Sequence, residues 1–115
     1  MSVSNAQICH ITIDASKLNC LDDRNFYQLV ALEIVGQLLK KAPCESLLNI
    51  PVPKNHYYFR LFLQAVREVL PVEHGTVLIV LRNQHLLTDL RKERFMALFK
   101  LDKGRTCQKI GLVLT

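Results

Sequence analysis

The hydrophobic and polar positions of this chain follow two different spacings, one typical of strands and one of helices. Segments 7–13, 76–81 and 108–114 are short, apolar and rich in β-branched residues, which predicts three strands. The second segment is apolar without a break, which is typical of a central strand with helices packed over both of its faces. In the first segment the residues expected to face the core are Cys9, Ile11 and Ile13.

Segments with apolar residues at helical spacing separate these strands. The first, from about 24 to 41, follows the capping pair Asp22-Asp23, and its polar stripe is narrow. We therefore expect this helix to be buried on more than one side. The second follows Asn55, which we expect to cap it, and ends before Pro71.

A third helix is expected to end near Leu101 and to begin either after Asn83, as its cap, or at Thr88. The apolar residues of segment 47–50 favour a further short strand. The order β-α-(β)-α-β-α-β predicts an α/β or α+β fold, with a single mixed β-sheet and about three helices packed on it. A length of 115 residues predicts a single domain over 1–115.

Half of the residues are hydrophobic, a high share for a chain of this length. The surplus fits either a well-filled core or a surface that covers a protein partner or a second copy of the chain. The longest apolar run, Val77–Leu81, is far shorter than the roughly 20 residues of a membrane-spanning helix, so no membrane contact is expected. The N-terminus lacks the pattern of a signal peptide, which predicts an intracellular protein, cytoplasmic or nuclear.

The residues that carry catalytic or cofactor chemistry are too scattered to predict an active site. The four glycines form no phosphate-binding loop, and no nucleophile is paired with a base at a known spacing. We expect no enzyme activity, no cofactor and no metal. The cysteines lie far apart, which favours reduced thiols over disulfides or zinc: Cys9, Cys20, Cys44 and Cys107.

The net charge of +5 is distributed unevenly. Residues 1–50 carry four basic and five acidic side chains, whereas residues 51–115 carry eleven basic and five acidic ones. A basic half of this kind indicates an anionic partner, commonly nucleic acid. The alternative is an ordinary solvated surface without such a partner.

The basic stretch from 82 to 109 is the strongest single feature. A patch of this kind neutralises phosphates, and the alternative is a solvated helix face balanced by Asp89 and Glu93. The residues expected to contact phosphates are Arg91, Lys92, Arg94, Lys103 and Arg105.

A second candidate surface lies where the second helix begins. Basic and aromatic residues alternate there, and such a pattern can stack on and neutralise a single strand of nucleic acid. In the alternative interpretation, Tyr57 or Tyr58 covers the core with its hydroxyl group exposed. The candidate residues are Lys54, His56, Tyr57 and Arg60.

The middle of the chain resembles the single-stranded nucleic-acid-binding domains named for an Arg-x-x-x-His signature. Segment 48–51 matches their apolar-proline segment, Arg60 matches the signature arginine, and Glu73-His74 matches an acidic-His pair. The sequence departs from the family at Gln64, where the signature has histidine, and at Pro71, where glycine is usual. The resemblance implies a grip on phosphate near Arg60, weakened by the missing histidine.

Together these observations predict a non-catalytic nucleic-acid-binding module that favours RNA or single strands. The alternative is a protein-interaction or scaffold subunit that dimerises or docks into a larger assembly through its apolar surface. The first helix and the C-terminal strand favour that alternative, because both are more apolar than a solvated surface requires.

Overall fold

The computed structural model describes residues 8–18, 22–41, 45–69, 76–99 and 110–115. Its elements in chain order are β1 (Ile8–Asp14), η1 (Ala15–Lys17), α1 (Asp23–Lys41), η2 (Glu45–Asn49), α2 (His56–Val69), β2 (Thr76–Arg82), η4 (Gln84–Leu86), α3 (Asp89–Phe99) and β3 (Ile110–Leu114). The predicted fold class is therefore confirmed: helices alternate with the strands of one sheet. No helix in the described ranges is both long and apolar enough to cross a membrane.

The sheet has the strand order β1-β2-β3, and both neighbouring pairs are parallel. The prediction of a mixed sheet is therefore wrong for the described residues, in which each crossover through helices returns the chain in the same direction. Alternate residues in register form the face that meets the core, as in the row Ile11, Ile79 and Leu112. Ile11 and Ile79 are fully buried, while Leu112 is half-buried. The predicted core residues of β1 are confirmed, with Cys9 half-buried at its start.

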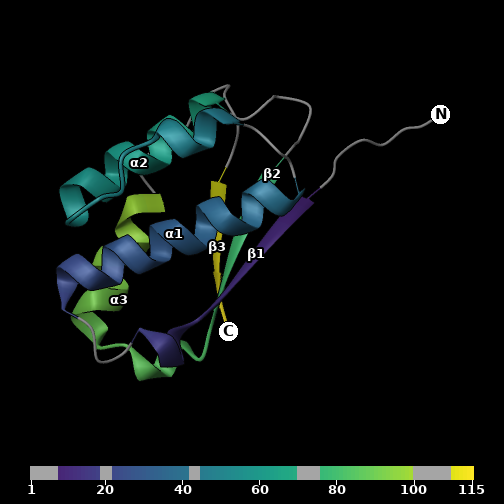
Figure 1. Cartoon of the computed structure of the whole chain (residues 1–115). Helices are drawn as coiled ribbons and strands as arrows, with labels where there is room; N and C mark the ends of the chain where they lie inside the picture. Colours follow the sequence, from purple (N-terminus) through teal and green to yellow (C-terminus); the bar gives the residue numbers. More distant parts are fainter. Residues whose placement is uncertain (1–7, 19–21, 42–44, 70–75, 100–109) are drawn as a thin grey trace.

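All three helices lie on one side of the sheet (Figure 1). Both connections cross the sheet in the same direction, and right-handed crossovers then place every helix on the same face. The prediction that β2 is covered on both faces is wrong for the described residues. Val77, Ile79 and Leu81 are buried, but Leu78 and Val80 on the opposite face are half-buried.

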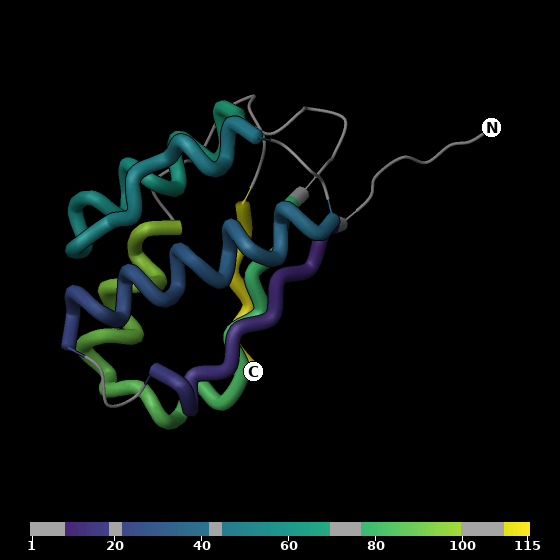
Figure 2. Tube along the Cα trace, in the orientation of Figure 1, coloured from purple at the N-terminus to yellow at the C-terminus, as the bar shows by residue number. Residues whose placement is uncertain are grey.

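Helix α2 lies on the outer side of α1 and α3, away from the sheet (Figure 2). Aromatic rings join the three helices: Phe26 of α1 lies 5.7 Å from Phe95 of α3, and Phe59 of α2 lies 5.7 Å from the same ring. Tyr27 of α1 also contacts Phe59, at 5.3 Å between centroids. Helix α1 is thus buried between the sheet and α2, as its narrow polar stripe predicted.

The predicted caps of the first two helices are confirmed. The Asp22 carboxylate accepts from the Asn25 amide, and the Asn55 side chain accepts from the Tyr58 amide. The third helix follows the later of its two predicted starts, because Thr88 Oγ1 accepts from the Arg91 amide. Each cap satisfies an amide that has no carbonyl partner in the first turn of the helix.

Two local predictions are wrong. Segment 47–50 does not form a strand, since Glu45–Asn49 is a short 3-10 helix whose Leu47 fills the core beside α1 and α2. Asn83 caps no helix through its side chain. It has a positive φ of 57° instead, and its side-chain amide donates to Asp14 Oδ1 at 2.9 Å.

Candidate interaction surface

The beginning of α2 meets α3, so that the two surfaces predicted separately from the sequence are neighbours. His56 Nε2 lies 3.1 Å from the carbonyl oxygen of Arg94. The His56 ring also packs edge-on against Tyr27, at 5.9 Å between centroids. Burial raises the pKa of the Tyr27 hydroxyl. His56 therefore serves as a contact between helices.

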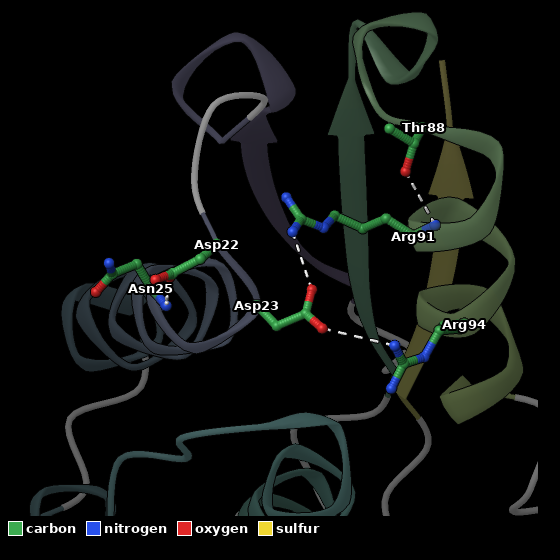
Figure 3. Close-up of polar contacts among 6 residues, drawn as sticks. All are labelled: Asp22, Asp23, Asn25, Thr88, Arg91 and Arg94. Atoms are coloured by element: carbon green, nitrogen blue, oxygen red, sulfur yellow. Dashed lines mark hydrogen bonds and ion pairs between the residues drawn. The ribbon is translucent and has the colours of Figure 1, made fainter.

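Arg91 and Arg94 share one face of α3, as predicted, and both reach Asp23 at the start of α1 (Figure 3). Arg91 Nη2 donates to Asp23 Oδ1 at 2.9 Å, and its guanidinium lies 4.8 Å from the centre of the Phe26 ring. Arg94 Nη1 lies 3.6 Å from Asp23 Oδ2. Only 17% of the Arg91 side chain is exposed, against 44% for Arg94. Arg91 thus stabilises the α1–α3 contact, and Arg94 offers more of its charge to solvent.

The other predicted phosphate contacts of the C-terminal half lie elsewhere. Lys92 Nζ donates to Gln84 Oε1 at 2.8 Å, next to the end of the sheet. Lys103 and Arg105 lie outside the described residues. The structure therefore does not gather the predicted phosphate ligands of this half into one open patch within the described ranges.

The exposed side of α2 carries a pair of tyrosines. Tyr57 and Tyr58 are 59% and 51% exposed, and their rings meet edge to face at 5.3 Å. Phe59, not either tyrosine, is the residue of this run that enters the core. Lys54 and Arg60 are exposed nearby. The alternative in which these rings cover the core is therefore wrong.

A groove lies beside Tyr58, between α2 and the extended segment that precedes it. Its volume is about 530 Å³, within the usual range of ligand-binding clefts. Leu61 and Val52, both 43% exposed, form part of its walls. We call this feature the α2 groove. Its lining consists of Ile50, Pro51, Val52, Pro53, Lys54, Tyr58, Leu61, Phe62 and Ala65.

Two features of this surface were missed in the sequence. Asp23 was assigned to helix capping, whereas it pairs with two arginines sixty-eight and seventy-one positions later. The α2 groove depends on the path of the segment 50–54 across the helix. The signals present were Leu61, an apolar residue among the polar positions of α2, and the two prolines that keep the preceding segment extended.

The carboxyl ends of β1 and β2 carry a second polar cluster. Asp14 accepts hydrogen bonds from the Asn83 side chain and from the Ser16 amide, both at 2.9 Å. The bond from Asn83, followed by that from Ser16, lowers the pKa of Asp14 from 3.8 to about 2. No group of three or more potential metal ligands occurs among the described residues. The contacts join the ends of two strands, and we assign no chemistry to them.

Comparison with known proteins adds no relative: no protein-family model matches the chain, and neither a curated protein nor a solved structure is significantly similar to it. The resemblance to the Arg-x-x-x-His domains stays a prediction. Arg60 and Gln64 are both exposed on α2, and Glu73-His74 lies outside the described residues.

Proposed function

We propose that this chain is a protein-interaction module that holds apolar side chains of a partner protein in the α2 groove. The observation that carries the proposal is the groove itself, a cleft of about 530 Å³ walled by exposed aliphatic and aromatic side chains. Exposed apolar surface of this kind is costly for an isolated chain and typical of a binding site. This choice favours the second of the two functions expected from the sequence.

The chemistry of the groove defines the partner segment. Its lining is apolar except for the hydroxyl group of Tyr58 and for Lys54, which is exposed. A complementary segment carries aliphatic or aromatic side chains together with a carboxylate that pairs with Lys54. Because the walls come from a helix and an extended segment held by prolines, the groove is largely formed before the partner binds.

Selection of random-sequence peptides against the immobilised chain tests this proposal. Selected peptides should be enriched in apolar and acidic residues, and Leu61→Asp should weaken their binding at least about tenfold, because it places a carboxylate in the groove. The matched control is Leu32→Asp, at an exposed leucine of α1 outside the groove. Peptides that bind both variants equally, or a failure to select any peptide, would contradict the proposal.

Binding of single-stranded nucleic acid is the second candidate function. It is favoured by Tyr57, whose exposed ring lies between the basic residues Lys54 and Arg60 in the sequence. Exposed aromatic rings stack on bases, and adjacent cations neutralise the phosphates. The engagement of Arg91 and Arg94 by Asp23 places this function second.

Fluorescence anisotropy with labelled single-stranded RNA and DNA at two salt concentrations tests the second candidate. Tyr57→Ala and Arg60→Glu should each abolish a binding that weakens as salt rises. Lys40→Glu is the matched charge control, since Lys40 is exposed at the opposite end of α1 from Tyr27. Absence of binding at low salt, or equal loss in the control, would reject a specific site here.

A further inference from the structure

The extended wall of the α2 groove is poor in backbone hydrogen-bond donors. Two of its residues, Pro51 and Pro53, have no amide hydrogen, which leaves Val52 and Lys54 as the amide donors of segment 51–54. Proline is also one of the residues by which exposed extended segments avoid pairing with another strand. Backbone hydrogen bonds from this wall therefore contribute little to what the groove can bind.

The backbone groups of the helical wall are already engaged. The lining residues on this side belong to α2, whose amide and carbonyl groups bond to each other along the helix: Tyr58, Leu61, Phe62 and Ala65. The Tyr58 amide bonds to the Asn55 cap. An extended peptide in the groove would give up hydrogen bonds to water and find few replacements, at a cost for each unpaired group.

An α-helix avoids this cost because it satisfies its own backbone groups and binds through its side chains. The lining residues of α2 follow the spacing that such a helix can match. Tyr58 and Ala65 are seven residues apart, which is two helical turns or about 10 Å. A second helix packed against this ridge places apolar side chains at i, i+4 and i+7 along it. The small side chain of Ala65 lets the two helices approach closely at one end.

The composition of the walls does not favour a polyproline segment. Grooves that hold polyproline helices are lined with aromatic rings. Here the exposed apolar residues of the lining are chiefly aliphatic, with Leu61 and Val52 both 43% exposed, and Tyr58 is the exposed ring among the described lining residues. Aliphatic walls of this kind suit the leucine-rich face of an amphipathic helix.

Charge indicates which amphipathic helix the groove fits. Lys54 is the charged residue of the lining, and no described lining residue is acidic. Arg60 is exposed on α2 nearby, and the chain as a whole carries a net charge of +5. An acidic segment is attracted to such a surface, whereas a basic one is repelled.

We propose that the partner segment in the α2 groove is an acidic amphipathic helix. Its apolar residues recur at i, i+4 and i+7, and a carboxylate at one end of this stripe pairs with Lys54. This inference rests on the function proposed above and names the class of partner that the groove takes.

Two peptide libraries of identical leucine and glutamate content, screened against the immobilised full chain, test the inference. In the first, leucines occupy i, i+4 and i+7, and in the second they alternate with polar residues. We expect the first library to supply the tighter peptides. Leu61→Asp and Val52→Asp, one on each wall, should each weaken their binding at least about tenfold, while Leu32→Asp should not.

A proline placed at a solvent-facing position in the middle of the best peptide tests its conformation. Proline breaks a helix but is tolerated in an extended or polyproline segment, so it should weaken binding at least about tenfold. Alternating peptides that bind as tightly through Leu61, or binding that tolerates the proline, would overturn the helical partner and leave the proposed function standing. If neither library yields a peptide that depends on Leu61 and Val52, both proposals fail.

A charge exchange tests the pairing with Lys54. Lys54→Glu should weaken the best peptide by a few fold, because a charge at the rim of an interface contributes modestly. Replacing the peptide's terminal glutamate by lysine should restore its affinity for Lys54→Glu and lower its affinity for the unmodified chain. Affinities that do not change in either direction would overturn the assignment of the carboxylate to Lys54.

Discussion

The β1 edge and the β3 edge are ends of the same parallel sheet, yet only one of them is covered by described side chains. Gln37 and Lys41 lie one turn apart on α1 and place polar groups against the β1 backbone. The corresponding neighbours of β3 are Met96 and Phe99 of α3, which offer apolar surface and no hydrogen bonds. Whether the backbone groups of an edge strand find hydrogen-bond partners thus depends on the identity of two residues on one helix, and not on the fold.

The same contrast gives the narrow polar stripe of α1 a structural role, because the stripe lies against the edge of the sheet. Gln37, a residue of this stripe, is half-buried and bonded to the strand. Glu33 Oε1 accepts from Gln37 Nε2 at 3.2 Å, which fixes the orientation of the amide. Polar residues next to a strand edge act as part of the sheet.

The largest expected effect comes from a substitution in the central strand β2, which pairs with both edge strands. Ile79→Ala removes a fully buried side chain between Ile11 and Leu112, and should lower the free energy of unfolding by about 2–5 kcal/mol. Val80→Ala, on the open face of the same strand, should cost less, because Val80 is half-buried. Urea denaturation of both variants measures the difference. Equal losses would mean that the open face is buried as fully as the core.

The fold was predictable because hydrophobic spacing determines which residues can be buried. Residues such as Ile11, Phe59 and Ile79 could be placed in the core without knowledge of their partners. Whether a parallel strand is covered on one face or two was not predictable from β2. That depends on the direction of both crossovers, a property of the whole chain.

The candidate surface was predictable only in part. Whether a charged side chain is available to a ligand depends on its neighbours in the fold, and those neighbours can lie far away in the sequence. Arg91 and Arg94 were correctly assigned to one helix face, but the partner that engages them, Asp23, lies on another helix. The exposure of Tyr57 depends on which of three consecutive aromatic residues enters the core, and in the structure that residue is Phe59. Local spacing leaves such choices open.

A smaller effect is expected from the side chain that seals the β1 edge. Gln37→Ala removes both hydrogen bonds to Thr12 and should lower the free energy of unfolding by about 1 kcal/mol, because water can reach the exposed groups. The Thr12 amide should then exchange faster, because it no longer donates to Gln37. Gln64→Ala, at an exposed glutamine of α2, is the control. An unchanged Thr12 exchange rate would show that Gln37 does not protect the edge.

Acid should weaken the β1 side of the sheet before the β3 side. The pKa of Asp14 is lowered to about 2, so its hydrogen bonds stabilise the folded chain fully above pH 4 and are lost as the pH falls toward 2. Carboxyl-detected NMR titration measures this pKa. Asn83→Gly removes the main donor but keeps the positive φ of 57°, and should return the pKa of Asp14 toward 3.8. An unchanged titration in Asn83→Gly would exclude the Asn83 bond as the cause.

The smallest expected effect comes from the glycine of β3, whose neighbour Leu78 lies on the open face of the sheet. A methyl group at Gly111 would lie 3.2 Å from Leu78 Cδ1, the end of a half-buried side chain that can move aside. Gly111→Ala should therefore change the free energy of unfolding by no more than about 0.5 kcal/mol. Gly36→Ala meets no atom within 4 Å and should stabilise α1 by up to about 1 kcal/mol. Urea denaturation of both variants measures these changes, and a loss in Gly111→Ala well above about 0.5 kcal/mol would show that Leu78 does not move aside.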